Sequence, residues 1–114
     1  MTLEHPPAAH PTAGLDDVVH QRNRLGILTV VAEADEAEFS FLQDVLGLTA
    51  GNLNRHLAVL SEAGLITLRK KDTRGGRPKT WVKITESGRK ALAREMSALE
   101  QLLRRHQAGP TSPP

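Results

Sequence analysis

The stretch FSFLQDVLGLTAGNLNRHLAVLSEAGLI, residues 39–66, decides the fold. Its apolar residues recur at steps of three and four positions, which predicts two helices joined by a short turn. The first helix is short, with Ser40 as its expected N-cap, and Gly47 ends it. The second helix covers residues 50–63 and is capped by Thr49. A short helix, a tight turn with a glycine and a longer helix form a helix-turn-helix.

The segment before this stretch is expected to form one long helix. Asp16 and Asp17 suit the N-terminus of a helix, where the macrodipole is positive. The apolar residues that follow step by three and four positions and give the helix one apolar face: Val18, Val19, Leu25, Leu28 and Val31. We therefore predict a single helix from about residue 15 to Ala34, ended by the acidic stretch 33–38.

The segment after the helix-turn-helix has the pattern of a β-hairpin. Gly64 suits the left-handed residue that ends a helix, and beyond it the apolar period changes from 3.6 to two. Apolar and polar residues alternate over residues 66–69 and again over 81–84, with glycines and a proline between them in 72–78. We predict a hairpin with a long tip, the wing. Trp81 lies on the opposite face from the apolar residues of its strand and is expected to cover the hairpin.

A last helix is predicted from Thr85, its N-cap, to about His106, with Glu86 and Lys90 paired one turn apart. Its apolar residues follow a heptad-like stripe of Leu92, Met96, Leu99 and Leu103. We expect this stripe, with Val18 and Leu25 of the first helix, to form a dimer interface, because an unpaired stripe would expose apolar surface to water. The alternative is that the stripe packs only on the first helix of its own chain.

The elements together define the fold class and the domain. The fold is mainly α with a small β-hairpin (α+β), a winged helix-turn-helix with an extended C-terminal dimerisation helix. One domain is expected over residues 15–106, since 114 residues are too few for two cores. Residues 1–14 and 107–114 are rich in Pro, Ala, Gly and Thr and are expected to be disordered tails.

Composition and charge exclude several classes of protein and favour a polyanionic partner. The chain has no cysteine, which excludes disulfides, thiolate metal sites and a cysteine nucleophile. No apolar run is long enough to cross a bilayer and the N-terminal residues do not resemble a signal peptide, so we expect a cytoplasmic protein without a membrane partner. The net charge is only +2, but residues 66–90 hold nine basic residues against two acidic ones. Such a patch points to a polyanionic partner, and on charge alone the alternative is a solvated, charged hairpin.

The candidate DNA-binding residues lie on the second helix of the helix-turn-helix and in the wing. The positions that face away from the apolar side of residues 50–63 are Ala50, Gly51, Asn54 and Arg55, with Thr49 at the start. Arg55 can bind guanine through two hydrogen bonds, and Asn54 can pair with adenine or bond a phosphate. His56 is expected to be a structural, hydrogen-bonded residue. In the wing, the candidates for the minor groove and its phosphates are Arg74, Arg77 and Lys79.

Residues 17–104 resemble the MarR and ArsR superfamily of bacterial winged-helix regulators, in particular its small single-domain members. The resemblance is carried by Leu48-Thr49, Arg55-His56-Leu57 and Glu62-Ala63-Gly64-Leu65, and by the second stretch KKDTRGGRPKTWVKITESGRKAL, residues 70–92. It implies a homodimer built from the first and last helices, with two helices 50–63 in successive major grooves of double-stranded DNA. Metal-sensing members use cysteines or clustered histidines, which this chain lacks, so no metal or cofactor is expected.

These features predict a dimeric, sequence-specific transcriptional repressor that reads a pseudo-palindromic operator, and two other functions stay open beside it: a protein-binding module and a regulator gated by a small molecule. An enzyme is not expected, because Gly75-Gly76 lie in a hairpin rather than between a strand and a helix, and no serine has a nucleophile motif. A winged-helix module that binds protein would not require Arg55, Arg74 and Arg77 on one face. A small-molecule effector would fit a crevice between the first and last helices, with Arg22, Leu25, Leu92 and Met96 as candidate lining residues.

Overall fold

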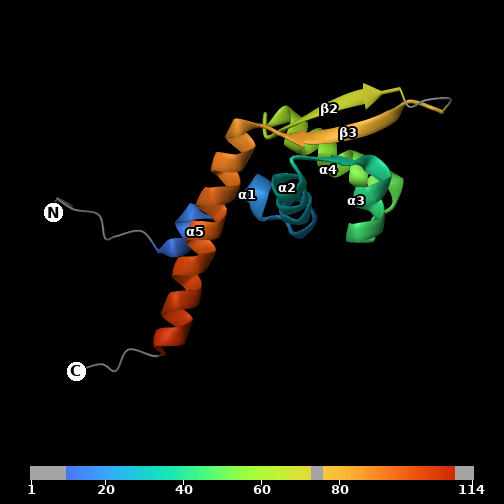
Figure 1. Ribbon diagram of the computed structural model, residues 1–114. Helices are drawn as coiled ribbons and strands as arrows, with labels where there is room; N and C mark the ends of the chain where they lie inside the picture. Colours follow the sequence, from blue (N-terminus) through green and yellow to red (C-terminus); the bar gives the residue numbers. More distant parts are fainter. Residues whose placement is uncertain (1–9, 73–75, 110–114) are drawn as a thin grey trace, which may run out of the picture.

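The computed structural model describes residues 10–72 and 76–109, which form a helical domain with one small sheet (Figure 1). The elements follow the order η1 (Pro11–Gly14), α1 (Asp17–His20), α2 (Arg22–Ala34), β1 (Glu36–Glu38), α3 (Phe39–Leu46), α4 (Ala50–Glu62), β2 (Ile66–Lys71), β3 (Lys79–Ile84) and α5 (Glu86–Ala108). The winged helix-turn-helix fold, with its long last helix, is confirmed.

The helix-turn-helix consists of α3 and α4, as the spacing of apolar residues predicts. Gly47 ends α3 in the left-handed conformation with φ 64°, which glycine adopts without steric cost. Thr49 caps α4, since its Oγ1 accepts a hydrogen bond from the backbone N–H of Asn52 at 3.1 Å. Only the predicted N-cap of α3 was wrong: the N-cap is Glu38, and the hydroxyl of Ser40 donates to Glu38 Oε1 at 2.8 Å instead.

The predicted first helix is in fact two helices, α1 and α2, separated at Gln21. The backbone of Gln21 leaves the helical region, with φ −58° and ψ 132°, and its side-chain oxygen accepts hydrogen bonds from the N–H groups of Asn23 and Arg24. Val19 of α1 and Leu28 of α2 are both buried in the core, so the apolar spacing in the sequence continues across the break. The side chain of Gln21 therefore caps a new helix at a point where the apolar pattern alone predicts an unbroken one.

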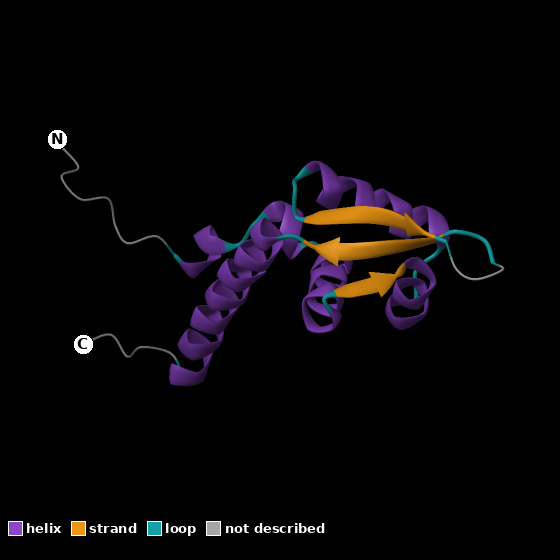
Figure 2. Cartoon of the chain, turned by 45° about the horizontal axis from the view of Figure 1, so that its top comes forward, coloured by secondary structure: helices purple, strands orange, loops and turns teal. Residues whose placement is uncertain are grey.

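The sheet has three antiparallel strands in the order β1-β3-β2 (Figure 2). The predicted hairpin is present, with Ile66 opposite Ile84 and Leu68 opposite Val82. The third strand, β1, was not predicted from the acidic stretch 33–38. It pairs with β3 through three residues, and only Ala37 of β1 is buried. Trp81 is half-buried on the outer face of the sheet, as its alternation predicts, with Lys71 Nζ 5.0 Å from its ring centroid.

The core lies between the inner face of the sheet and the helices α1 to α4, with the start of α5 closing it (Figures 1 and 2). Its largest fully buried apolar side chains come from helices α1 to α4 and from the strands β2 and β3: Val19, Ile27, Leu28, Val31, Leu42, Leu53, Leu57, Leu60, Ile66 and Val82. Burial of these side chains supplies most of the driving force for folding. It also fixes α4 against the sheet, so that the opposite face of α4 is the exposed one.

Helix α5 is anchored to the domain at its first turns and then extends away from it (Figure 1). Thr85 caps it by accepting from the N–H of Gly88 at 2.9 Å, as predicted, and donates to the carbonyl of Gly64 at 2.7 Å. A Cβ at Gly88 would overlap the carbonyl oxygen of Leu65, so glycine permits this close approach. Among the residues that the structure describes, no helix is long and apolar enough to cross a membrane.

The N-terminal segment differs from the disordered tail expected over residues 1–14. Residues 11–14 form the 3-10 helix η1, which lies against α5 (Figure 1). A Cβ at Gly14 would lie 3.1 Å from the Cβ of Ala98, so the two elements pack closely. Helix α5 ends at Ala108, two residues beyond the predicted end. The remaining parts of the two expected tails, 1–9 and 110–114, lie outside the described residues.

Candidate nucleic-acid interface

The outward face of α4 is made of small and polar residues. Leu53, Leu57 and Leu60 are buried beneath the helix. The predicted DNA-contact residues Thr49, Ala50, Gly51, Asn54 and Arg55 are all exposed. Two small residues in the first turn leave room for close approach to a surface, and Asn54 and Arg55 supply hydrogen-bond donors beside them. This is the arrangement that a helix needs to reach base edges in a groove.

His56 points to the other side of α4, where it is held by side chains of α2. Arg24 Nη1 lies 3.3 Å from His56 Nδ1, and the amide of Asn23 lies 3.3 Å from Nε2. A guanidinium can only donate, so Nδ1 accepts and the proton of the neutral ring lies on Nε2, where the Asn23 amide can take it up only through its oxygen. Burial lowers the pKa of His56 from its usual value, and the charges of Arg24 and Arg55 lower it further. The structure thus gives His56 the hydrogen-bonded environment that was expected.

Arg24 was not singled out from the sequence, yet it connects three helices. Its Nε donates to the carbonyl of Val18 at 2.6 Å and its Nη2 donates to the carbonyl of Asp17 at 3.3 Å. With the contact to His56, this single side chain joins α1, α2 and α4. The one indication of this role in the sequence is that Arg24 flanks the apolar stripe of its helix, but an arginine at such a position is usually exposed to solvent.

The wing is described on both sides of its tip. Residues 73–75, which include the predicted contact Arg74, lie outside the described residues. Arg77 is exposed two residues before the returning strand β3 begins at Lys79. Lys79, the third predicted wing contact, forms an ion pair with β1, because its Nζ lies 3.6 Å from Glu38 Oε1.

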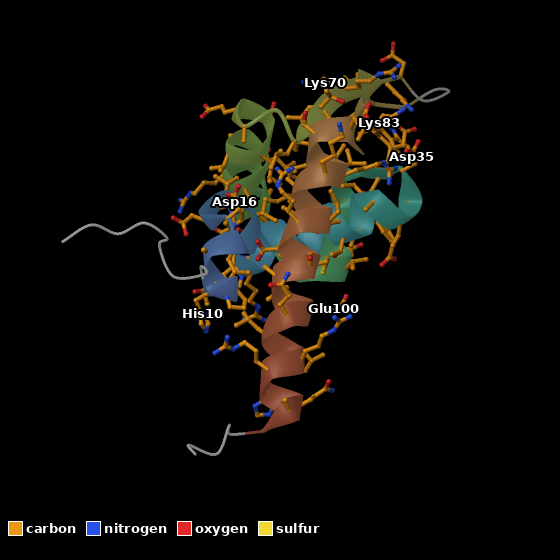
Figure 3. The ribbon with its side chains drawn as sticks, turned by 90° about the vertical axis from the view of Figure 1, so that its left-hand side faces the viewer. His10, Asp16, Asp35, Lys70, Lys83 and Glu100 are labelled. Carbon is orange, nitrogen blue, oxygen red and sulfur yellow. The ribbon has the colours of Figure 1, made fainter. Side chains whose placement is uncertain are left out.

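Acidic residues around β1 neutralise part of the basic patch that the sequence predicts. Besides the pair of Lys79 with Glu38, Lys71 Nζ lies 2.6 Å from Glu36 Oε1. Asp35 binds two further basic residues, Arg89 at 2.9 Å and Lys83 at 3.8 Å, and Asp35 and Lys83 lie side by side in Figure 3. Counting charge along the chain missed these acids because they lie in β1 or directly before it, 35 to 54 residues away.

Two basic residues of β2 keep their charge unpaired. Arg69 and Lys70 are exposed, and within residues 10–72 and 76–109 neither takes part in an ion pair. The exposed Arg55 of α4 likewise has no acidic partner there. The positive surface is therefore smaller than the sequence count suggests.

A hollow of about 380 Å³ separates α4 from the wing. Asn54 lines it from α4, and residues 78–80 line it from the wing. Residues 38–40, where β1 passes into α3, complete its wall. Three elements that are distant in sequence thus frame one concave surface next to the outward face of α4.

The expected dimer residues fall into two groups in the structure. Leu92 is buried in the core of its own chain, and Val18 and Leu25 pack against that core. Further along α5, Met96 is 40% exposed and Leu103 is 53% exposed, with Leu99 between them partly buried. The second group holds the exposed apolar side chains, whereas Val18 and Leu25 are partly buried, and the dimer interface stays a prediction.

The four residues expected to line an effector crevice are also distributed differently. Leu92 belongs to the core and Leu25 packs against it, whereas Arg22 and Met96 are exposed. The structure therefore does not bring these four side chains to one open wall, and small-molecule gating stays a prediction. A hollow in this part of the molecule lies instead between η1 and α5, beside Arg94.

One buried carboxylate on α5 was not anticipated. Glu95 is fully buried, and its Oε1 accepts a hydrogen bond from the backbone N–H of Asp16 at 3.0 Å. Its Oε2 lies 2.6 Å from Nδ1 of His20 on α1. Glu95 thus joins α5 to the start of α1 with both oxygens. No pattern in the sequence indicated its burial, because glutamate at a helical position is usually exposed.

Comparison with known proteins identifies the family. The family model for the winged helix DNA-binding domain matches residues 23–103. A transcriptional regulator homologue from Pyrococcus horikoshii OT3 is 36% identical and has a TM-score of 0.70, with 76% of this chain and 85% of that chain covered. The resemblance to bacterial regulators suggested that the chain comes from a bacterium. Since this relative is archaeal, that source stays a prediction.

Two more distant structures share the fold. A MarR-family transcriptional regulator from Rhodococcus sp. RHA1 has a TM-score of 0.69 at 16% identity, covering 90% of this chain and 71% of that one. The transcriptional regulator MOSR of Mycobacterium tuberculosis, whose structure is a complex with DNA, has a TM-score of 0.66 at 18% identity, covering 91% and 74%. The chain belongs to the family of winged helix DNA-binding domains, and it is a homologue of transcriptional regulators.

Proposed function

We propose that the chain is a dimeric, sequence-specific DNA-binding repressor that occupies a pseudo-palindromic operator. The observation that carries the proposal is the outward face of α4, where Ala50 and Gly51 leave space beside the donors of Asn54 and Arg55. Exposed donors next to small residues suit contact with base edges in a major groove. With α4 in the major groove, the wing reaches the neighbouring minor groove with Arg77, and Arg74 belongs to the same segment.

The dimer is supported by the outer half of α5. Met96 and Leu103 are exposed on a stripe with Leu99, along a helix that extends beyond the domain core. A second α5 packed along this stripe would bury these side chains. Two α4 helices would then bind half-sites about 10 base pairs apart, centre to centre. MOSR, which has the same fold, has been crystallised in complex with DNA, which supports DNA as the partner proposed for this chain.

The proposal is tested by fluorescence anisotropy with the DNA upstream of the gene and with a random duplex of equal length, across a salt series. Specific binding predicts tighter binding to the upstream duplex, with affinity for both duplexes falling as salt rises. Equal affinities for the two duplexes would show that the protein binds DNA without sequence specificity. Binding to neither duplex at low salt would favour the alternative, a winged-helix module that binds protein.

A further inference from the structure

The hollow between α4 and the wing is where the backbone of bound DNA would have to pass, and it contains a carboxylate. One sugar-phosphate strand separates the major groove of a duplex from the adjacent minor groove. If α4 enters the first and the wing the second, this strand runs between Asn54 and residues 78–80. Glu38 lines the same hollow. A cation would be favoured at this point, because phosphate contacts of Lys and Arg supply much of the affinity for DNA.

Glu38 is fixed in the hollow by its neighbours on two elements. Its Oε1 accepts a hydrogen bond from the hydroxyl of Ser40 at 2.8 Å and lies 3.6 Å from Nζ of Lys79. Although Glu38 is the N-cap residue of α3, its side chain makes no capping hydrogen bond. The carboxylate is therefore not required to begin the helix.

The two partners of this ion pair differ in their freedom to move. The side chain of Lys79 is 49% exposed, so its ammonium group can turn toward a phosphate. The side chain of Glu38 is only 24% exposed and is bonded to Ser40. When Lys79 turns to the DNA, the carboxylate stays close to the same phosphate.

We infer that Glu38 limits the affinity of the interface for the DNA backbone, an inference that rests on the proposed function. A carboxylate near a phosphate repels it, and Lys79 must offset this repulsion before it adds to binding. Because the effect acts on the backbone, it weakens binding to every sequence by a similar factor. Random DNA is then bound weakly, and stable binding depends on the base contacts of α4.

The test compares two neutral variants of β1. Glu38→Gln removes the charge and keeps a side-chain oxygen that can accept from Ser40. Glu36→Gln makes the same change in net charge on the same strand and also breaks an ion pair, that with Lys71. Glu36 does not line the hollow between α4 and the wing, but only a neighbouring one with Phe41 and Trp81 that Glu38 also borders, and so it controls for the overall charge of the protein. Binding to the upstream and random duplexes is measured by anisotropy in a salt series.

We expect Glu38→Gln to bind both duplexes about three- to tenfold more tightly at low salt. The slope of log K against log salt should steepen by about one, because Lys79 now neutralises a full phosphate. Glu36→Gln should change either affinity by less than about twofold, and Glu38→Asp, which keeps the charge, should bind as the wild type does. If the glutamine variant melts early by circular dichroism, Glu38→Ala provides the neutral side chain instead.

Two results would overturn the inference while leaving the proposed function intact. Equal gains in Glu38→Gln and Glu36→Gln would mean that only the net charge matters. Unchanged or weaker binding by Glu38→Gln would mean that the carboxylate does not oppose the backbone. A wild-type protein that binds neither duplex would instead overturn the proposed function, and the role of Glu38 with it.

Discussion

The guanidinium of Arg24 on α2 donates a hydrogen bond to the imidazole of His56 on α4 across 3.3 Å. The same guanidinium donates to the backbone carbonyls of Val18 and Asp17, which lie on α1. Helix α4 is therefore fixed from behind by a polar contact as well as by its buried leucines. Because the opposite face of α4 carries Arg55, this contact positions the proposed DNA-reading surface.

Replacing Arg24 with lysine should loosen α4 while leaving the net charge unchanged. Lysine lacks the fixed fork of donors that reaches both the backbone carbonyls and His56. We expect Arg24→Lys to lower the free energy of unfolding by about 1–2 kcal/mol in urea titrations and to weaken binding to the upstream duplex. Arg22→Lys, at an exposed neighbouring position, is the matched control. Equal stability of the two variants would show that the Arg24 contacts contribute nothing.

The stability of the fold should fall as the pH is lowered below the usual pKa of His56. Burial and the nearby arginines lower the pKa of His56 in the folded protein. Between the lowered value and the unfolded value of about 6.5, the unfolded chain binds more protons, so stability rises with pH there. The contribution is thus present above about pH 6.5 and is lost at lower pH.

This prediction is measured as the free energy of unfolding of the wild type and of His56→Gln between pH 5 and 8. Glutamine can still accept a hydrogen bond from Arg24 but cannot titrate. The wild type should lose more stability than the variant on the acidic side. Parallel pH profiles would show that His56 does not take part in the acid sensitivity.

The helix-turn-helix and the hairpin could be predicted because local patterns specify them. The change of apolar period from 3.6 to two near Gly64 separates helix from strand, and Thr49 and Thr85 form the caps that their positions predict. The strand β1 could not be predicted, because three residues with glutamates at both ends have no strand pattern of their own. It forms through pairing with β3, with Ala37 buried, and this is a tertiary effect.

The sequence predicted where the residues of the candidate site lie better than it predicted the net charge of their surface. The spacing of Leu53 and Leu57 places Asn54 and Arg55 on the outward face of α4. The pairing of Lys79 with Glu38 depends on the fold, because the two residues meet only across the sheet. Sequence windows add up charges along the chain, whereas the field at a surface depends on charges that are close in space.

Arg55→Ala should reduce specific DNA binding by about 1–3 kcal/mol, as the loss of a base contact does. The preference at one position of each half-site should relax, while binding to random DNA changes little. Anisotropy with operator variants at each position provides the measurement. Equal losses on the upstream and random duplexes would show that Arg55 contacts only the backbone.

The contrasting variant is Arg77→Ala in the wing. A residue that contacts phosphates should weaken binding to all sequences alike and flatten the salt slope by about one unit. A change in base preference with Arg77→Ala would instead give the wing a part in sequence recognition.

Glu95→Leu should destabilise the junction between α1 and α5, although leucine is more hydrophobic than glutamate. The substitution leaves the N–H of Asp16 and the ring of His20 without their acceptor. The half-exposed His20 ring can bind water instead, so the cost of about 1–3 kcal/mol for a donor left without a partner applies mainly to the partly buried N–H of Asp16. Glu95→Gln keeps an acceptor oxygen and should cost less. The free energies of unfolding of both variants, with exposed Glu100→Leu as control, test this. A more stable leucine variant would show that packing outweighs the hydrogen bonds.

Leu103→Lys should convert the proposed dimer to a monomer without unfolding the domain. Leu103 is 53% exposed near the end of α5 and lies outside the core cluster, so its loss removes little intramolecular packing. A buried unpaired ammonium group in a helix–helix interface is costly, because it loses its hydration without gaining a partner. Sedimentation velocity at micromolar concentration compares the wild type, Leu103→Lys and Gln101→Lys, which adds the same charge on a different face of α5. A wild type that already sediments as a monomer, or a Leu103→Lys variant that stays dimeric, would remove the outer half of α5 from the interface.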